Sequence, residues 1–424
     1  MYQEGLLDKI LYQIKKIIPK SVFNFFQPTY HIFLSYTGAL IYGFPSKSLK
    51  VIGVTGTKGK STTVYLVSKI LEAGGHQVAA IGSLGYKIKN QEWPNTLKMT
   101  MPGRFKLHKF LAQAKRAGCT HVVLEVTSEG IKQKRHLGIN FDCAVFTNLH
   151  KEHIESHGSF ENYYRAKQEL FQRTKNIHVI NADDPHVKLF GDFSAHKKIY
   201  YGIGRGDMSA RNVQLSLDKA EFDIYSTHFR LNFGGKFNVY NALAALAVGA
   251  MYGIDLPTAM PALEGIKDIP GRMEFVQKQP FGVVIDYAHT PDSLEAVYET
   301  LTNELPEGNK LICVLGAAGG GRDAWKRPEF GRIADQYCQE IILTDEDPYE
   351  EDPKTILDQI SSGITNTAKI KRIVDRKAAI AQAIKFARGG DIVIITGKGS
   401  ETSMALASRK KIPWSDRDVA REAL

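Results

Sequence analysis

The sequence predicts an α/β protein with two successive domains, each built on a mainly parallel sheet. Between Lys50 and about Ile269 short β-branched runs alternate with helical segments, and a second alternation of the same kind begins near Val283. Such alternation is typical of parallel sheets covered by helices. A glycine-rich loop between the first strand and the first helix supports the same class, because phosphate-binding loops (P-loops) occur at this point of α/β folds.

The 49 residues before the first strand predict a short helical segment, residues 1–49, rather than a domain. Apolar side chains recur at helical spacing from Leu6 to Ile18, and Pro19 ends that helix. Residues 29–44 carry no Asp, Glu, Lys or Arg, but are shorter than the roughly 20 residues that cross a bilayer. Two interpretations stay open: a helix packed on the first domain, or an amphipathic anchor that brings residues 6–44 to a membrane surface. No signal-peptide layout is present.

The first domain is expected to span residues 50–270 and to end at a Pro-Gly linker. Its expected strands are 51–54, 78–81, 121–125, 144–147 and 178–181, its helices are 62–73, 105–117, 160–172 and 241–252, and residues 210–233 predict short antiparallel strands. The second domain, 271–424, is expected to be Rossmann-like. Its expected strands are 283–286, 310–315, 340–344 and 391–395, and its helices are 293–301, 327–337 and 378–387.

Composition narrows the class of protein. With 43% hydrophobic and 24% charged residues the chain is globular rather than disordered. The net charge of +10 fits an anionic partner, but no Lys/Arg-rich run interleaved with aromatic residues is present, so we expect no nucleic acid. The widely spaced Cys119, Cys143, Cys313 and Cys338 form no CxxC pair, and predict reduced core cysteines of a cytoplasmic protein rather than a disulfide or zinc framework.

The glycine-rich loop runs from Gly56 to Ser61, between the strand 51–54 and a helix. Backbone N–H groups and the helix dipole converge there on an anion. Lys60 adds a positive charge for a terminal phosphate, and Ser61 adds a hydroxyl that can bind Mg²⁺. The loop is shorter than the common P-loop, and a purely structural glycine turn is the alternative.

Two polar residues follow other strands of the first domain. Glu125 ends one expected strand, and His153 follows another. The carboxyl ends of parallel strands meet at one edge of a sheet, which is also the edge of the phosphate loop. The carboxylate is the better Mg²⁺ ligand, because this ion prefers oxygen, and a plain loop histidine is the alternative for His153.

Three loops of the second domain carry polar residues at the carboxyl ends of strands: 286–292, 319–323 and 397–401. Arg272 lies at the expected junction of the domains, where it could bind phosphate, although an isolated surface arginine is the simpler interpretation. From the residues alone, we expect an ATP-dependent enzyme that works in the cleft between two α/β domains.

The motifs together resemble the Mur ligases of peptidoglycan precursor synthesis, and their tripeptide synthetases in particular. The resemblance runs from about Lys50 to Leu424 and rests on the stretches GTKGKSTT, FTNLHKEH, INADD, GKFNVYNALAA, GRME, DYAHTPDSL, GGGRDAWKRP, GKGSE and SDRDVA. The family's larger UDP-binding N-terminal domain has no counterpart among residues 1–49, so the resemblance is to a member with a truncated N-terminal domain.

The resemblance implies a role for each matched residue. The ATP site would comprise Gly56, Thr57, Lys58, Gly59, Lys60, Ser61, Thr62, Asn238, Asn241, Arg272, Asp286 and His289. Mg²⁺ would be held by Ser61 and Glu125, with His153 and a carbamylated Lys167 serving a second ion. Without the family, Lys167 would be interpreted as an exposed helical lysine.

The implied reaction forms an amide between a UDP-N-acetylmuramoyl-peptide carboxylate and an amino acid, through an acyl phosphate. Acceptor contacts would be Thr100, Thr127, Ser128, Gln133 and Arg135, and the incoming amino acid would meet Asp345, Asp347, Tyr349, Gly397 and Glu401. Tyr349 stands where the family's arginine reads a distal carboxylate, and six carboxylates lie between 345 and 352. This favours L-lysine or another basic diamino acid over meso-diaminopimelate, unless the acidic stretch is only a solvated turn.

Two other functions stay open. A folylpolyglutamate-synthase-like ligase would act on a different acceptor, although that family places glycine where Ser61 stands. A non-catalytic nucleotide-binding paralogue is the second, against which the intact Lys60, Glu125, His153 and Lys167 argue. We expect a monomer.

Overall fold

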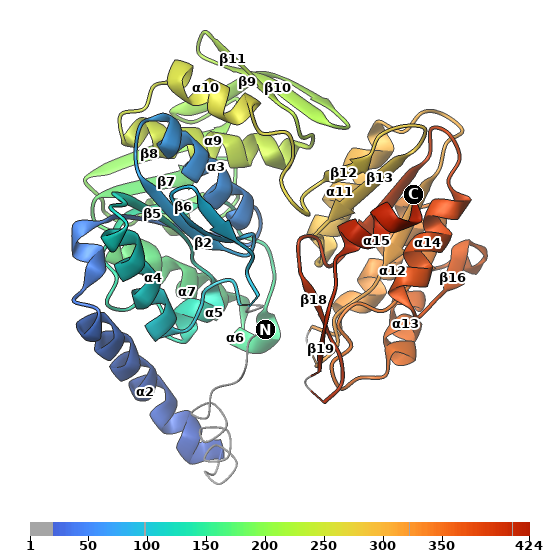
Figure 1. Cartoon of the computed structure of the whole chain (residues 1–424), viewed down its shortest axis with the longest axis horizontal. Coiled ribbons are helices and arrows are strands. Elements are labelled where there is room, and N and C mark those ends of the chain that lie inside the picture. Colours follow the sequence, from blue (N-terminus) through green and yellow to red (C-terminus); the bar gives the residue numbers. More distant parts are fainter. Residues whose placement is uncertain (1–19, 97–98, 322, 409) are drawn as a thin grey trace. The chain divides into compact units, whose positions relative to one another are not determined.

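A computed structural model describes residues 20–96, 99–321, 323–408 and 410–424, with side chains from Thr29 onward. The helix predicted from Leu6 to Ile18 lies outside these residues. The chain divides into two compact units (Figure 1). The first comprises residues 1–149, 161–208 and 243–259, and the second comprises residues 150–160, 209–242 and 260–424.

The first unit is built on a mainly parallel sheet with helices along it (Figure 1). Its strands lie in the order β8-β7-β6-β1-β5-β2-β3-β4. Their bounds are β1 Lys50–Thr55, β2 Val78–Gly82, β3 Gly85–Ile88, β4 Gln91–Trp93, β5 His121–Glu125, β6 Phe141–Phe146, β7 Ile177–Asn181 and β8 Lys197–Ile203. The central strand β1 pairs in parallel with β5 and β6, and its residues from Val51 onward are buried. The β-branched runs of the sequence therefore become the buried middle of the sheet.

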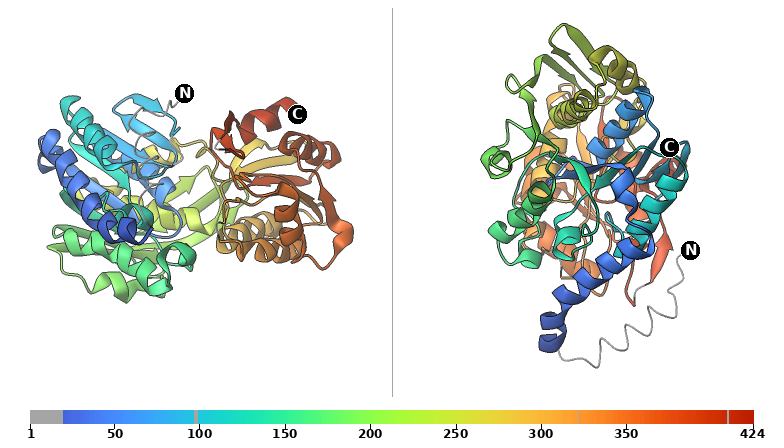
Figure 2. Two further views of the ribbon diagram at one scale, coloured as in Figure 1. Left: turned by 90° about the horizontal axis from the view of Figure 1, so that it is seen from below. Right: turned by 90° about the vertical axis from the view of Figure 1, so that its left-hand side faces the viewer.

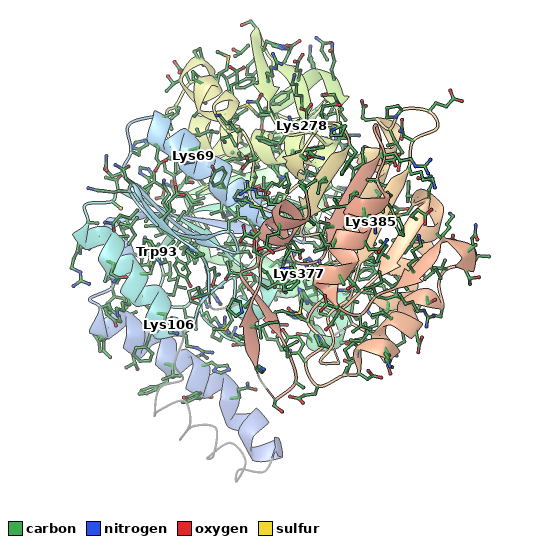
Figure 3. The ribbon with its side chains drawn as sticks, turned by 45° about the vertical axis from the view of Figure 1, so that its right-hand side comes forward. Lys69, Trp93, Lys106, Lys278, Lys377 and Lys385 are labelled. Carbon is green, nitrogen blue, oxygen red and sulfur yellow. A yellow bond between two sulfur atoms is a disulfide. The ribbon has the colours of Figure 1, made fainter. Side chains whose placement is uncertain are left out.

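Helices connect most of these strands. They are α3 Lys60–Ala73, α4 Arg104–Arg116, α5 Ser128–Lys132, α7 Phe160–Arg173 and α8 Val187–Gly191. The antiparallel hairpin β3–β4 was not predicted, since its short strands are partly or fully exposed and carry no apolar run. Tyr86 of β3 stacks on Trp93 of β4, which Figure 3 labels.

Helix α2 (Lys20–Ile41) precedes this sheet and is followed by a short 3-10 turn, η1 (Pro45–Ser48). Its buried residues Ser35 and Ala39 face inward, and the Ser35 hydroxyl donates a hydrogen bond to the Lys134 carbonyl. Figure 2 shows the N-terminal end of the helix projecting from the first unit. The prediction of a helix packed on the first domain is confirmed. Among the helices that the structure describes, none is long and apolar enough to span a bilayer.

The second unit contains a six-stranded sheet in the order β12-β13-β17-β14-β15-β16. The strands are β12 Glu274–Gln277, β13 Gly282–Asp286, β14 Leu311–Leu315, β15 Glu340–Leu343, β16 Ile370–Arg372 and β17 Ile392–Thr396. All neighbouring pairs are parallel except β12–β13. The helices are α11 Pro291–Asn303, α12 Lys326–Tyr337, α13 Pro353–Ser361, α14 Arg376–Phe386 and α15 Asp416–Ala423, with the 3-10 turn η2 Thr367–Lys369. Apolar clusters cover both faces, as expected of a Rossmann-like domain.

The remaining elements interrupt the α/β alternation. Strands β9 (Met208–Ser216), β10 (Lys219–Ile224) and β11 (Thr227–Leu231) form the predicted antiparallel run, and β18 (Ser403–Ala405) pairs with β19 (Lys411–Pro413). The short α6 is Ile154–His157, and α10 is Leu256–Glu264. Helix α9 (Lys236–Met251) begins five residues earlier than predicted, because Gly235, at a φ of 95°, turns the chain directly into the helix.

The cysteine prediction is wrong for one pair. Cys313 in β14 and Cys338 directly after α12 form a disulfide, whereas Cys119 and Cys143 are free and buried. The sequence separation of 25 residues concealed the pair. Helix α12 leads the chain back to the strand from which it departed, which places the two Cα atoms 6.1 Å apart. The proximity of Cys313 and Cys338 therefore depends on how α12 packs against the sheet, which the sequence alone does not show.

Candidate functional site

The phosphate loop needs glycine at two positions. Gly56 follows β1 with a φ of 147°, and a Cβ atom there would lie 1.9 Å from the Thr147 hydroxyl oxygen. Gly59, with a φ of 78°, immediately precedes the first turn of α3. A side chain at Gly56 would collide with the Thr147 side chain, which itself hydrogen-bonds the loop, and would crowd the Asn148 backbone at 3.1 Å. Lys60 and Ser61 then open the helix, where the first N–H groups have no partner within the helix.

The chain after β6 braces this loop. Asn148 accepts from the Thr57 N–H with its carbonyl and from the Lys58 N–H with its side chain, both at 2.8 Å. Thr147 donates its hydroxyl hydrogen to the Lys58 carbonyl at 2.7 Å. These contacts fix the loop before any ligand binds, which lowers the entropy cost of holding a phosphate.

The INADD stretch supports that brace. Asn181 donates to the Thr147 carbonyl at 2.7 Å, and Asp184 accepts from the Leu149 N–H at 2.8 Å. Both side chains are buried. Within the first unit this motif therefore positions the loop after β6.

Ser61 and Glu125 meet beside the phosphate loop, as the strand ends predicted. The Ser61 hydroxyl donates to Glu125 Oε2 at 2.9 Å, and the Ser83 N–H donates to the same oxygen at 2.8 Å. Both Ser61 and Glu125 are buried. Lys60 Nζ lies 2.8 Å from the Thr57 carbonyl oxygen. Two hard oxygen donors next to a phosphate loop suit Mg²⁺, which completes its shell with phosphate oxygens and water. No described residues form a cluster of three or more His, Cys, Asp or Glu that would hold a metal by themselves.

Lys167 is buried rather than exposed. Its Nζ donates to the Gly56 carbonyl at 2.6 Å and lies 4.5 Å from the centre of the Tyr163 ring. The hydroxyl of Tyr163 is in turn 3.0 Å from that of Thr57. The interpretation of Lys167 as an exposed helical lysine is therefore wrong, and α7 delivers this amine directly to the phosphate loop.

The residues that the resemblance assigns to the acceptor lie in the same unit. Thr100 and Ser83 share a hydrogen bond between their hydroxyls at 2.8 Å. Thr127 caps α5 by accepting from the Gly130 N–H, and the buried Ser128 begins that helix. Arg135 donates to the Gln133 side-chain oxygen at 2.7 Å. Because Ser83 also donates its N–H to Glu125, hydrogen bonds link Thr100 to the Ser61–Glu125 pair beside the phosphate loop.

In the second unit, Asp286 organises the loop that carries Arg272. Its buried carboxylate accepts from the N–H groups of Met273 and Ala288, both at 2.7 Å. Burial raises the pKa of Asp286, an effect that the Arg272 charge opposes. The guanidinium of Arg272 lies over the ring of Tyr287, 4.4 Å from its centre. Asp286 thus acts on the backbone, and Tyr287, which lies in the predicted loop 286–292, packs against the Arg272 guanidinium.

The Pro270-Gly271 step is packed rather than a loose linker. Gly271 has a φ of 63°, and a Cβ atom there would lie 2.1 Å from the Ser400 nitrogen. The carbonyl of Gly271 accepts from the Tyr287 N–H at 3.0 Å. This close approach joins the Arg272 loop to the loop containing Gly397 and Glu401.

Four further predicted residues, Asn238, Asn241, His153 and His289, lie in the second unit. Asn238 donates to the Gly234 carbonyl at 2.7 Å, and Asn241 donates to the Asn238 side chain at 3.2 Å. His153 has a φ of 54° and precedes α6. His289 lies beside Tyr287 and is 2.8 Å from that residue's carbonyl oxygen. None of these contacts tests a role in nucleotide binding.

The acidic stretch 345–352 is not a solvated turn throughout. Glu346 and Asp347 are buried, and Asp347 is 3.0 Å from Lys398 Nζ, which also lies 2.7 Å from Glu401. Gly397, with a φ of 104°, is packed so tightly that a Cβ atom would lie 2.3 Å from Glu346 Oε2. The predicted residues Asp347, Gly397 and Glu401 therefore come together around a buried lysine. Tyr349 follows at a φ of 52° and is half-buried.

Glu346 stands out within this cluster. Burial, reinforced by Asp347 and Glu401 and opposed by Lys398, raises its pKa to about 7. Within the described part of the chain its carboxylate has no hydrogen bond or ion pair. Arg376, whose charge also lowers the pKa of Glu346, is bound by Asp416 through two contacts of 2.7 and 2.8 Å. The Glu346 carboxylate is therefore available to form an ion pair with an additional cation.

The outer carboxylates have structural partners. Glu350 accepts from the Ser408 N–H, Glu351 binds Arg327, and Asp352 caps α13. Asp345 accepts from the N–H of Glu346. The sequence analysis treated all six acids as one group that favours a cation, whereas in the described structure the outer acids bind other groups of the protein and Glu346 does not. The buried Arg376–Asp416 pair was not predicted, although Asp416 lies in the SDRDVA stretch on which the family resemblance partly rests.

Two family patterns of known proteins match most of the chain. The family pattern described as "Mur ligase middle domain" matches residues 54–249, and the pattern described as "Mur ligase, glutamate ligase domain" matches residues 271–399. The chain belongs to the Mur ligase family. It is accordingly an ATP-dependent, amide-forming ligase of peptidoglycan synthesis.

Individual relatives of this Mur ligase cover most of the chain. It is 37% identical to a UDP-N-acetylmuramyl-tripeptide synthetase from Roseiflexus sp., over 94% of this chain and 82% of the relative. It is 38% identical to a UDP-N-acetylmuramoyl-L-alanyl-D-glutamate–2,6-diaminopimelate ligase from Syntrophomonas wolfei, over 92% and 81%. A solved structure of a ligase with the latter name has a TM-score of 0.64 at 30% identity, covering 92% and 82%. Folylpolyglutamate synthase from Mycobacterium tuberculosis, at 17% identity and a TM-score of 0.72 over 86% and 92%, shares the fold.

Proposed function

We propose that this Mur ligase uses ATP and Mg²⁺ to join a basic diamino acid, L-lysine, to a carboxylate of a UDP-N-acetylmuramoyl-peptide. The buried Glu346 carboxylate carries the choice of amino acid. It lies against Gly397 and beside Asp347 and Glu401, residues that the family resemblance assigns to the incoming amino acid. A side chain that ends in an ammonium group would neutralise this site, whereas one that ends in a carboxylate would add a like charge.

The available cations support the same choice. A distal carboxylate would need a free guanidinium or ammonium, and Tyr349 offers neither. Arg376 is held by Asp416, and Lys398 is held by Asp347 and Glu401. Recruiting either for a ligand carboxylate would leave a buried acid without its partner, which is costly. Several relatives are named for 2,6-diaminopimelate, so this substrate is the direct competitor.

The phosphate loop supports the ATP half of the reaction. The acceptor carboxylate attacks the γ-phosphorus and ADP leaves, giving an acyl phosphate; the amine of the amino acid then attacks the acyl carbon, and phosphate leaves as the amide forms. Lys60 and the first N–H groups of α3 would stabilise the charge on the transferred group. Ser61 and Glu125 would hold Mg²⁺, which supplies further charge neutralisation when bound.

Lys167 is proposed to act as a carbamate. An ammonium group cannot bind a cation, but a carbamate offers two oxygens of the kind that Mg²⁺ prefers. The Lys167 amine is buried and donates to the Gly56 carbonyl, which places it within the phosphate loop.

A membrane surface is proposed as a further partner of α2. The outer face of this helix exposes Tyr30, Phe33, Tyr36, Leu40 and Ile41, while the inner face is buried. Residues 29–44 carry no charge, and the chain as a whole carries +10. Aromatic and aliphatic side chains on one face of a helical segment without charged residues suit the boundary of an anionic bilayer.

Phosphate release tests the amino-acid proposal. The full chain is assayed with ATP, Mg²⁺ and UDP-N-acetylmuramoyl-L-alanyl-D-glutamate, and with L-lysine, L-ornithine, meso-diaminopimelate or L-glutamate in turn. We expect kcat/KM for L-lysine to exceed that for meso-diaminopimelate by about tenfold or more, the size of one lost charge interaction of about 1.4 kcal/mol. A preference for meso-diaminopimelate would overturn the assignment of Glu346, and a preference for L-glutamate would favour a polyglutamate-type ligase.

A further inference from the structure

Two arginines of the first unit lie close together and share a partner. Arg104 begins α4, and Arg135 follows α5. The guanidinium of Arg104 donates to the Gln133 carbonyl, while that of Arg135 donates to the Gln133 side-chain oxygen and to the Met101 carbonyl. In the described residues neither guanidinium forms an ion pair with a carboxylate. Their hydrogen-bond acceptors are neutral, so neither positive charge is paired directly with a carboxylate that the structure describes.

The surroundings make those charges costly. The Nε atom of each arginine is buried without a hydrogen-bond partner in the described structure. Burial and the neighbouring charge of Arg135 lower the pKa of Arg104 to about 10. Burial likewise lowers the pKa of Arg135, an effect that the charge of Glu129 opposes. Like charges that are partly removed from water destabilise the fold unless an anion joins them.

A hydrogen-bonded path connects the pair to the phosphate loop. Ser61 binds Glu125 at 2.9 Å, Glu125 binds the Ser83 N–H at 2.8 Å, and the Ser83 hydroxyl binds that of Thr100 at 2.8 Å. Met101, whose carbonyl binds Arg135, is the next residue. All of these residues belong to the first unit. The pair therefore lies at the far end of a continuous polar path that starts at the phosphate loop.

We propose that Arg104 and Arg135 together bind an oxyanion of the acceptor, and that Arg104 determines acceptor affinity. Two adjacent guanidinium groups can grip one carboxylate or phosphate group through bidentate, charge-assisted hydrogen bonds. The family resemblance assigned Gln133 and Arg135 to the acceptor, but not Arg104. The identity of the acceptor in this inference rests on the proposed function. The binding of an oxyanion by the two arginines does not.

The main test replaces Arg104 with methionine in the full chain. Methionine keeps the unbranched apolar stem and removes the charge. We expect the acceptor Kd, measured by calorimetry without ATP, to weaken by about tenfold or more, and the acceptor KM to rise in parallel while the KM for ATP stays within about twofold. Arg116→Met removes the same charge from an exposed position on α4 and is the matched control. Both variants lie on α4, the helix on which Figure 3 labels Lys106.

Two small probes distinguish the source of the oxyanion. UDP presents a diphosphate, and L-alanyl-D-glutamate presents carboxylates. Binding of each is followed by ligand-observed NMR with wild-type protein, Arg104→Met and Arg104→Lys. Loss of UDP binding in Arg104→Met assigns the phosphate, and loss of dipeptide binding assigns the carboxylate. Arg104→Lys, which keeps the charge without the bidentate geometry, should bind at an intermediate level and guards against a folding defect.

The results separate this site from the proposed function. If Arg104→Met binds the acceptor and both probes as wild type does, the site is overturned while ligation stands. If wild-type protein fails to ligate the muramoyl acceptor but still binds a probe that Arg104→Met does not bind, the anion site stands and the acceptor assignment falls.

Discussion

Replacing Glu346 with glutamine should change the stability of the protein in a pH-dependent way. Burial raises the pKa of this carboxyl from 4.5 to about 7. A raised pKa means that ionisation is penalised in the folded state, so the penalty is absent below pH 4.5 and complete above pH 7. At about 1.4 kcal/mol per pH unit, the wild-type protein loses up to about 3 kcal/mol of unfolding free energy across this range. Glu346→Gln should therefore be the more stable protein at pH 8, by an amount that shrinks towards pH 5.

Binding of L-lysine should show the opposite dependence. The ionised fraction of a carboxyl with a pKa of about 7 rises from about one tenth at pH 6 to about nine tenths at pH 8. The lysine side chain stays protonated over this range. Wild-type affinity should thus increase up to about tenfold from pH 6 to pH 8, and each binding event should release protons to the buffer. Glu346→Gln should bind more weakly at pH 8 and lose this dependence.

Calorimetry provides the measurement. L-lysine is titrated into each full-length protein at pH 6, 7 and 8, in two buffers of different ionisation enthalpy, so that released protons are counted. Glu350→Gln, which removes an exposed acid of the same loop, is the control and should behave as wild type. Identical pH slopes in wild type and Glu346→Gln, or proton uptake on binding, would refute the reasoning.

The other predictions concern the phosphate loop and α2. Lys60→Ala should lower kcat on the order of 10²–10³-fold, because the backbone donors remain but the charge on the γ-phosphate is lost; half of wild-type turnover would contradict the assignment. Lys167→Ala should be nearly inactive and partly rescued by short-chain carboxylates. Intact-mass analysis of the wild-type protein under CO₂ should show the added mass of a carbamate, and finding only the unmodified amine would contradict the prediction. Replacing Phe33 and Leu40 together with serine should reduce co-sedimentation with anionic liposomes several-fold, while equal binding would remove the membrane contact.

The sequence by itself determined the two α/β folds and the phosphate loop. β-branched runs such as 51–54 are dictated by local patterning and burial, and Gly56 and Gly59 occupy conformations that few other residues tolerate. The pairing of Ser61 with Glu125 also followed from sequence, because parallel strands bring their carboxyl ends to one edge. These features depend on residues close in the chain or on a general rule of sheet topology.

Only the tertiary structure decided which charges have partners. Lys167 is buried at the Gly56 carbonyl, Cys313 is bonded to Cys338, and Arg104 shares Gln133 with Arg135. In the acidic stretch, Glu346 lies unpaired beside Lys398, while the outer acids are bound elsewhere. Each of these facts depends on the packing of segments far apart in the chain, and on the dielectric environment that burial creates. A sequence pattern records the charge of a residue, but its desolvation and its partners arise from the fold.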